Sequence, residues 1–304
     1  MGLGTNNVDV TDAANFIPEL WSDEVIADFT KSLVLANLVT KFDHTGKRGD
    51  TINVPKFTRS SASSKSAGSQ VTLTSPTHGT VAISINKHYE YSVLIEDIVA
   101  VQALDTLRQS YSQDMGYALA KQIDTDLVQL GRAVQGGNGT NAYNAGVTAG
   151  DGSTAYNASG NESAITDAGF RKAIQTLDDA DVPVEDRYFT VPPSARNTLM
   201  GLSRFTEQAF VGESANANTI RNGKIGDLYG VSVFVSSNCD TTSNAGARVC
   251  FLAHKSALGL AMQQNVRVQT QYKQEYLADL LTSDALYGIA ELRNDAAIAM
   301  VTSA

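Results

Sequence analysis

Three aspartates close together are the residues whose type and spacing best fit a chemical role. Asp178, Asp179 and Asp181 could bind a divalent cation, which prefers carboxylate oxygens, or could form the acid/base pair of a hydrolase. They also stand at the predicted end of a helix, shortly before Pro183, where aspartate is a common turn residue. We therefore interpret them as turn residues and keep an acidic-pair hydrolase as an alternative.

A second acidic pair, Asp124 and Asp126, lies within a predicted helix. The pair lacks the glycine and the terminal glutamate of a calcium-binding loop, so it does not predict a metal site. We expect both carboxylates on the solvent-facing side of that helix.

The remaining residues with chemical potential form no recognisable site. The histidines are scattered, which predicts solvated side chains instead of metal ligands or a general base. They are His44, His78, His88 and His254. Cys239 and Cys250 lie in apolar surroundings and predict two small core residues, not a disulfide or a metal pair.

The sequence also lacks the familiar motifs of cofactor-binding and catalytic sites. The string from Gly137 to Ala142 fits G-x-G-x-x-A, but it follows a helix and opens none, so it lacks the context of a dinucleotide-binding turn. The sequence holds no phosphate-binding loop, zinc-protease motif or nucleophile elbow. No catalytic residue, cofactor or metal is therefore predicted, and no apolar run is long enough to predict a membrane span.

Charge is unevenly distributed along the chain. The net charge of −9 argues against a broad phosphate-binding face. Counted by segment, it is about −5 for residues 1–40, about +4 for 41–90 and about −8 for 91–304. One basic segment therefore lies between two acidic ones.

The longest predicted element is a helix over residues 96–135. Its apolar side chains recur every three or four residues and draw one stripe along it. They are Val101, Leu104, Tyr111, Met115, Leu119, Ile123, Leu127, Leu130 and Val134. At ~1.5 Å per residue the helix would span roughly 55 Å, which is the length of a strut.

The basic segment predicts a long β-hairpin over residues 41–95. A short first strand covers 51–54, a long second strand covers 81–93, and the serine-rich tip between them has almost nothing to form a core. Because an isolated two-stranded ribbon is marginal in water, such a hairpin should lie against another surface.

The rest of the chain predicts a mixture of helices and strands. Helices are expected at 17–37, at 163–180 and after Ser194, which fits an N-cap. Strands are expected at 187–191 and 231–235 and through a β-rich C-terminal third, in which residues 271–282 form a short helical or extended connection.

This order of elements, together with three stretches of sequence, resembles the major capsid proteins of tailed phages with the Hong Kong ninety-seven-type fold. The stretches are Phe16-Ile-Pro-Glu-Leu-Trp-Ser22, Leu177-Asp-Asp-Ala-Asp-Val-Pro183 and Gly223-Lys-Ile-Gly-Asp-Leu-Tyr-Gly-Val-Ser-Val-Phe-Val235. The resemblance implies an α+β subunit in four parts: an N-terminal arm (1–40), an extended hairpin called the E-loop (41–95), a peripheral P-domain and an axial A-domain (136–248). The P-domain combines two segments, the spine helix (96–135) and a C-terminal β-rich part (249–304).

The resemblance also implies a function. Such subunits assemble as pentamers and hexamers into an icosahedral shell that encloses double-stranded DNA without sequence-specific binding. We therefore expect a non-enzymatic virion protein, assembled in the host cytoplasm without a membrane. Because some relatives carry an N-terminal scaffolding extension that is not seen here, we expect a separate scaffolding protein, with a portal and possible cement proteins as further partners. An encapsulin-like cellular shell is the other alternative.

The charge map suggests where subunits meet. The hairpin cannot pack on itself, so its basic side chains are predicted to contact an acidic patch of the adjacent subunit. These predicted contact residues are Lys47, Arg48, Lys56, Arg59 and Lys65.

Overall fold

Three β-sheets and one long helix organise the part of the chain that the structure describes. The computed structural model describes residues 34–46, 48–57, 60–71, 73, 75, 77–97, 106–132, 148–152, 162–202, 227–239 and 247–303. In chain order the elements are α1 (Leu35–Leu38), β1 (Thr40–Asp43), β2 (Thr51–Lys56), β3 (Gly79–Ser84), β4 (Lys87–Glu96), α3 (Thr106–Arg132), β5 (Thr148–Ala149), α4 (Asp167–Asp179), β6 (Arg187–Val191), α5 (Pro193–Met200), β7 (Asp227–Leu228), β8 (Val231–Val235), β9 (Ala247–His254), β10 (Leu258–Lys273), β11 (Ala278–Glu291), the 3-10 turn η2 (Asn294–Ala296) and β12 (Ala297–Ser303).

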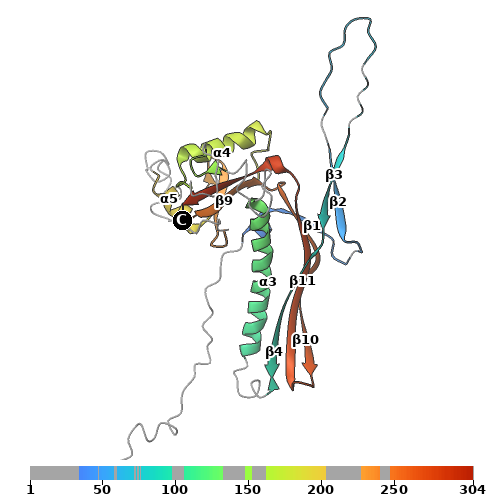
Figure 1. Ribbon diagram of the computed structural model, residues 1–304, viewed down its shortest axis with the longest axis vertical. Helices are drawn as coiled ribbons and strands as arrows, with labels where there is room; N and C mark the ends of the chain where they lie inside the picture. The colour runs from blue at the N-terminus through green and yellow to red at the C-terminus, as the bar shows by residue number, and fades with distance from the viewer. Residues whose placement is uncertain are drawn as a thin grey trace, which may run out of the picture.

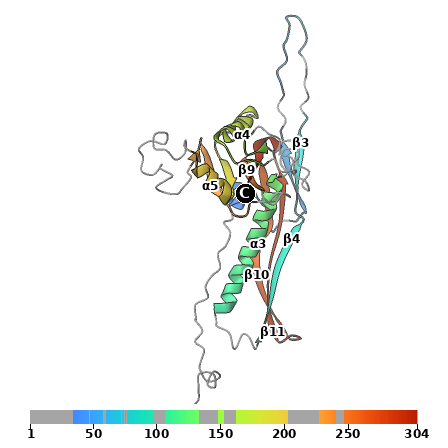
Figure 2. The same ribbon diagram turned by 60° about the vertical axis from the view of Figure 1, so that its left-hand side comes forward.

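The long helix α3 confirms the predicted strut over its described length. Met115 and Leu127 are fully buried, and Leu119 and Ile123 are nearly so, as the stripe predicts. Figures 1 and 2 show α3 lying alongside the long strands β4, β10 and β11. Met115 packs there with Ile95 of β4, so the stripe faces this sheet.

The sheet beneath α3 has four strands in the order β1-β10-β11-β4. Strands β10 and β11 form a long antiparallel hairpin whose pairing reaches Lys273 opposite Ala278. The expectation of a connection over 271–282 is therefore wrong, because most of that segment is strand. Polar residues such as Gln269 and Gln271 hid the strand, since their side chains are exposed and leave no apolar alternation.

The predicted second strand of the hairpin is two strands in two sheets. Strand β3 pairs with β2 from Ser84 opposite Thr51 to Gly79 opposite Lys56. After a break at residues 85–86, β4 pairs with β11 in the four-stranded sheet. We call β2, β3 and the described residues between them the projecting hairpin, because they extend away from the rest of the subunit in Figure 1.

The base of the projecting hairpin has a small core within its own subunit, contrary to the sequence-based expectation. Ile83 and Ile85 are buried against Ala261 of β10. Beyond β2 and β3, every described residue from 60 to 71 is exposed. Only the outer part of the hairpin therefore lacks a surface to pack on.

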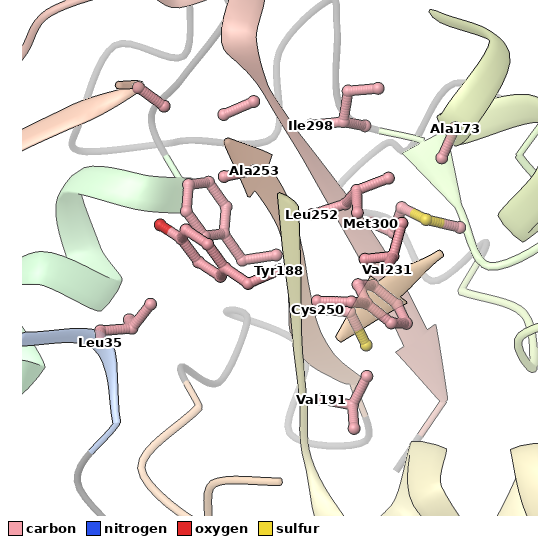
Figure 3. Close-up of a cluster of buried hydrophobic side chains, with 14 of the residues drawn as sticks. Leu35, Ala173, Tyr188, Val191, Val231, Cys250, Leu252, Ala253, Ile298 and Met300 are labelled. Atoms are coloured by element: carbon pink, nitrogen blue, oxygen red, sulfur yellow. The ribbon is translucent and has the colours of Figure 1, made fainter. Parts of the chain in front are cut away.

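The main core surrounds the six-stranded sheet, whose order is β5-β12-β9-β6-β8-β7. Figure 3 shows side chains from several of its strands gathered in one cluster, among them Val231, Cys250, Leu252 and Met300. Strands β9 and β12 come from the predicted C-terminal part of the P-domain, and β6 and β8 from the predicted A-domain. The last segment of the chain thus contributes to both large sheets, and the domain boundaries stay a prediction.

The helix ends follow ordinary capping rules with one departure from the sequence analysis. The Thr166 hydroxyl accepts a hydrogen bond from the Gly169 N–H at 3.0 Å and caps α4. Ser194 does not cap α5, because the helix begins at Pro193, whose fixed backbone suits the first helical position, and the cap position belongs to Pro192.

Candidate assembly surface and its buried anchor

The outer part of the projecting hairpin exposes large apolar side chains. Leu73 is 89% exposed and Phe57 is 74% exposed. The ring of Phe57 stacks on that of His78, with centroids 4.7 Å apart, so the two limbs of the hairpin also touch just beyond the outer end of the β2–β3 pairing. Apolar groups held this far from the described core are typical of a surface that a partner covers.

Basic side chains accompany these apolar groups. Arg48, Lys56 and Lys65 are exposed, whereas Lys47 and Arg59 lie outside the described residues. Among the ion pairs between described residues, none involves the three exposed cations. Arg48 and Lys65 therefore have no ion-pair partner among the described residues, whereas Lys56 also interacts electrostatically with Asp295 of its own subunit.

Exposed carboxylates gather at the opposite end of the molecule, where β4 ends and β10 turns into β11. We call them the far-end carboxylates: Glu96, Asp97, Asp114 and Glu275. Figures 1 and 2 show the projecting hairpin and this end of the sheet pointing in opposite directions. The hairpin tip therefore cannot reach the far-end carboxylates of its own subunit.

Asp124 is buried, so the prediction that it lies on the wet side of the helix is wrong. Its side chain is inside the protein, 1% exposed, because other segments cover this side of α3 as well. The backbone N–H of Leu35 donates to one carboxylate oxygen at 2.9 Å, and the Asn238 amide donates to the other at 2.9 Å. Asp124 thus joins the start of the described chain and the segment after β8 to the helix.

Asp126 is also buried, 4% exposed, and the same prediction is wrong for it. The Lys87 ammonium lies 2.9 Å from its carboxylate, and the Tyr287 hydroxyl donates to it at 2.6 Å. Burial and this hydrogen bond both raise the pKa of Tyr287, so the hydroxyl stays a donor. Asp126 therefore joins α3 to the first residue of β4 and to β11.

Asp284 of β11 is the centre of a third polar cluster, which links three neighbouring strands of the four-stranded sheet, β10, β11 and β4. The Arg267 guanidinium donates to it at 2.8 Å, and His88 lies 3.3 Å away. These hydrogen bonds, that of Arg267 foremost, lower the pKa of Asp284 to about 2 although burial opposes the shift. His88 is therefore part of a cross-strand pair in addition to being solvated.

Replacing Arg267 with glutamine should raise the pKa of Asp284 toward its ordinary value of 3.8, because the largest stabilising partner of the carboxylate is lost. A folded-state pKa below the unfolded value contributes stability that is present above the unfolded value and is lost as the pH falls through the folded one. The wild type should thus lose this contribution between pH 3.8 and about 2, and the variant should lose less. NMR titration of the Asp284 carboxyl carbon measures the shift directly, and an unchanged titration would contradict the assignment.

A family model described as phage capsid protein matches residues 31–300. The chain belongs to the phage capsid protein family. No curated protein sequence matched the chain.

Solved structures show the same fold for this capsid protein. A chain from Mycobacterium phage Che8 is similar over 94% of this chain and 97% of its own, with 24% identity and a TM-score of 0.74. The capsid of cyanophage P-SCSP1u is similar over 99% of this chain and 97% of its own, with 20% identity and a TM-score of 0.74. The capsid of Ralstonia phage GP4 has 15% identity and a TM-score of 0.68 over 95% of each chain. The fold is the Hong Kong ninety-seven type, and the chain is a major capsid protein of the virion.

The acidic residues first considered for chemistry do not form one site in this capsid protein. Asp178 pairs with the buried Arg187 at 2.7 Å. Asp181 follows the end of α4 with a positive φ of 55° and lines a cleft of about 460 Å³ under the projecting hairpin, whereas neither Asp178 nor Asp179 lines it. Asp178 and Asp179 are the last two residues of α4, so the prediction of turn residues is wrong for them and correct for Asp181. The three carboxylates do not line one cleft.

No metal or membrane site emerges from the part of the chain that the structure describes. Its histidines, cysteines and carboxylates form no group of three that could hold a metal ion. None of its helices is both long and apolar enough to cross a membrane. Cys239 and Cys250 are not joined in a disulfide; Cys250 is buried as predicted, and Cys239 is only partly so.

Proposed function

We propose that this capsid protein assembles as pentamers and hexamers into an icosahedral shell that encloses double-stranded DNA, without catalysis and without sequence-specific DNA contacts. The observation that supports this most is the separation of the projecting hairpin from the far-end carboxylates on one elongated subunit. An exposed apolar and basic limb with an acidic surface out of its own reach is suited to repeated contact between copies. Assembly would take place in the host cytoplasm, with a separate scaffolding protein and a portal as partners and cement proteins as possible additions.

We further propose that the basic residues of the hairpin region, Lys47, Arg48, Lys56, Arg59 and Lys65, contact the far-end carboxylates of the adjacent subunit. An exposed ion pair contributes only about 0–1 kcal/mol, so the apolar side chains of Phe57 and Leu73 would supply most of the affinity. The charges would instead select the partner and set the register of the contact.

Reversing Lys56 and Lys65 to glutamate together should leave the melting temperature of the monomer within a few degrees of the wild type, because both side chains are exposed. Assembly should slow or abort, since the same weakened contact recurs at every subunit. The defect should also depend on salt, because screening acts on exposed charges. Light scattering and negative-stain electron microscopy measure both effects, with closed particles or discrete capsomers expected from the wild type.

The matched control is the double reversal of Lys172 on α4 and Lys255 in the turn between β9 and β10, which are both exposed and do not belong to the projecting hairpin. It changes the net charge equally and should assemble normally. A wild type that stays monomeric with and without a scaffolding protein would overturn the proposed function. Assembly indifferent to the hairpin reversal would overturn only the contact.

The alternatives predict different contents and activity. An encapsulin-like shell would enclose cargo protein in place of DNA, which analysis of purified particles distinguishes. An acidic-pair hydrolase would show turnover that depends on Asp178 and Asp179. The family match and the ion pair of Asp178 with Arg187 both favour the capsid over these alternatives.

A further inference from the structure

One stretch of α3 holds both the start of the described chain and the root of the projecting hairpin. Leu35, whose N–H is bound by Asp124, is the second residue of the described chain and follows the N-terminal segment. Lys87, which pairs with Asp126, is the first residue of β4 and comes directly after the projecting hairpin. The two carboxylates are two positions apart on the helix, so they face different neighbours.

We propose that Asp124 and Asp126 are positioning residues for assembly: Asp124 fixes where the N-terminal segment joins the body, and Asp126 fixes where the projecting hairpin joins it. This inference rests on the proposed function, because positions of limbs matter when neighbouring subunits must receive them. A shared anchor on one rigid helix holds the two roots at a constant separation.

The chemistry of the site favours positioning over simple stabilisation. Burying a carboxylate is costly, and apolar residues of similar volume commonly serve stability as well or better. Asp124 is nevertheless almost fully buried, and its partners among the described residues are neutral donors, the Leu35 N–H and the Asn238 amide. Directional acceptors that hold one backbone N–H and one side-chain amide specify geometry in a way that apolar packing does not.

Asp126 is likewise a buried carboxylate that accepts directional hydrogen bonds. Lys87, Tyr287 and Gln122 all donate to its carboxylate, at 2.9, 2.6 and 3.0 Å. The three donors come from β4, β11 and α3 itself, so they fix the carboxylate from several directions. The Lys87 side chain is 29% exposed, and it spans from this buried anchor to the surface at the hairpin root.

Hydrogen exchange can separate the two anchors. Asp126→Ala should speed amide exchange at the hairpin root, residues 85–90, by at least tenfold and leave residues 35–38 unchanged. Asp124→Ala should speed exchange at 35–38 and near Asn238 and leave 85–90 unchanged. Each variant is thus the matched control of the other. Asp124→Asn should restore slow exchange, because an amide oxygen can still accept from Leu35 and the Asn238 amide can turn.

Assembly provides the readout that a merely structural role would not move. At a temperature where the variant monomers remain folded, both alanine variants should give at least tenfold fewer closed shells, with a broadened distribution of diameters, and Asp124→Asn should assemble like the wild type. Should an alanine variant fail to fold, Lys87→Met releases the hairpin root without opening a cavity, and Lys172→Met on α4 is its control.

Two results would overturn the inference. One is exchange that rises equally at both roots in each variant, since this indicates general loosening. The other is shells of wild-type number and diameter from variants whose roots are released. A wild type that forms no shell would contradict the proposed function, while the exchange pattern would still test the two anchors independently.

Discussion

Replacing Leu127 with aspartate should abolish the folded subunit. Leu127 is fully buried on α3, in the main core that also contains Ile123, Tyr188 and Leu252. An unpaired carboxylate there costs several kcal/mol, and the cavity left by the shorter side chain adds to this. Domains are typically stable by only about 5–15 kcal/mol, so most of the protein should be insoluble or unfolded. Circular dichroism and the yield of soluble protein measure the effect.

The control for this substitution is Gln129→Asp, two residues further along the same helix. Gln129 is exposed, so the same new charge should change the melting temperature by little. If Leu127→Asp had the same melting temperature as Gln129→Asp, Leu127 would not lie on the buried side of α3.

The apolar stripe of α3 could be predicted because burial on one side of a helix imposes a spacing of three to four residues. Met115, Leu119, Ile123 and Leu127 show that spacing, and all four are buried. The predicted first turns of this helix fall on residues 98–105, which lie outside the described residues.

The break between β3 and β4 could not be predicted from alternation. Ile83 faces the core at the hairpin base, whereas Val93 packs with Met115 of α3. Both occupy odd positions of one alternating pattern, which only Lys87 interrupts. Alternation reports that one face is buried and does not report which element buries it. The one mark that the change of sheet leaves on the sequence is Lys87, the first residue of β4, and a single polar residue does not identify a new partner.

The two buried carboxylates were missed for a related reason. Asp124 bonds to partners 89 and 114 positions away, and Asp126 bonds to Tyr287, 161 positions away. No local spacing carries information about such distant donors. The sequence offered one signal. Asp124 follows Ile123 and Asp126 precedes Leu127, so each aspartate lies at the edge of the buried face of the helix and not opposite it.

The candidate assembly surface was predictable in its charge and not in its geometry. Composition showed a basic hairpin between acidic segments, and the exposure of Arg48, Lys56 and Lys65 agrees with a surface role. The opposite directions of the hairpin and the far-end carboxylates depend on how β4 and β11 pair, which composition does not specify. The contact between them stays a prediction.

Replacing Gly288 with alanine should displace the root of the projecting hairpin. A Cβ at this position of β11 would lie 2.4 Å from the Ser84 carbonyl oxygen and 3.0 Å from the Ile85 Cα. Both are backbone atoms at the point where β3 ends, so no flexible side chain can move aside and the strands must separate. Overpacking of this kind costs about 1–3 kcal/mol, or roughly 2–12 °C in melting temperature for a chain of this size.

Gly116→Ala is the matched control for that substitution, because a Cβ there meets nothing within 4 Å and the residue lies inside α3. Alanine is the better helix former, so this variant should gain about 0.5–1 kcal/mol. Calorimetry should therefore show melting temperatures that move in opposite directions for the two glycine variants. If Gly288→Ala melted like the wild type, β11 and the hairpin root would not approach as closely as described. If it lost stability but assembled shells of normal diameter, the hairpin root would tolerate displacement, and the direction in which it leaves the body would not control assembly.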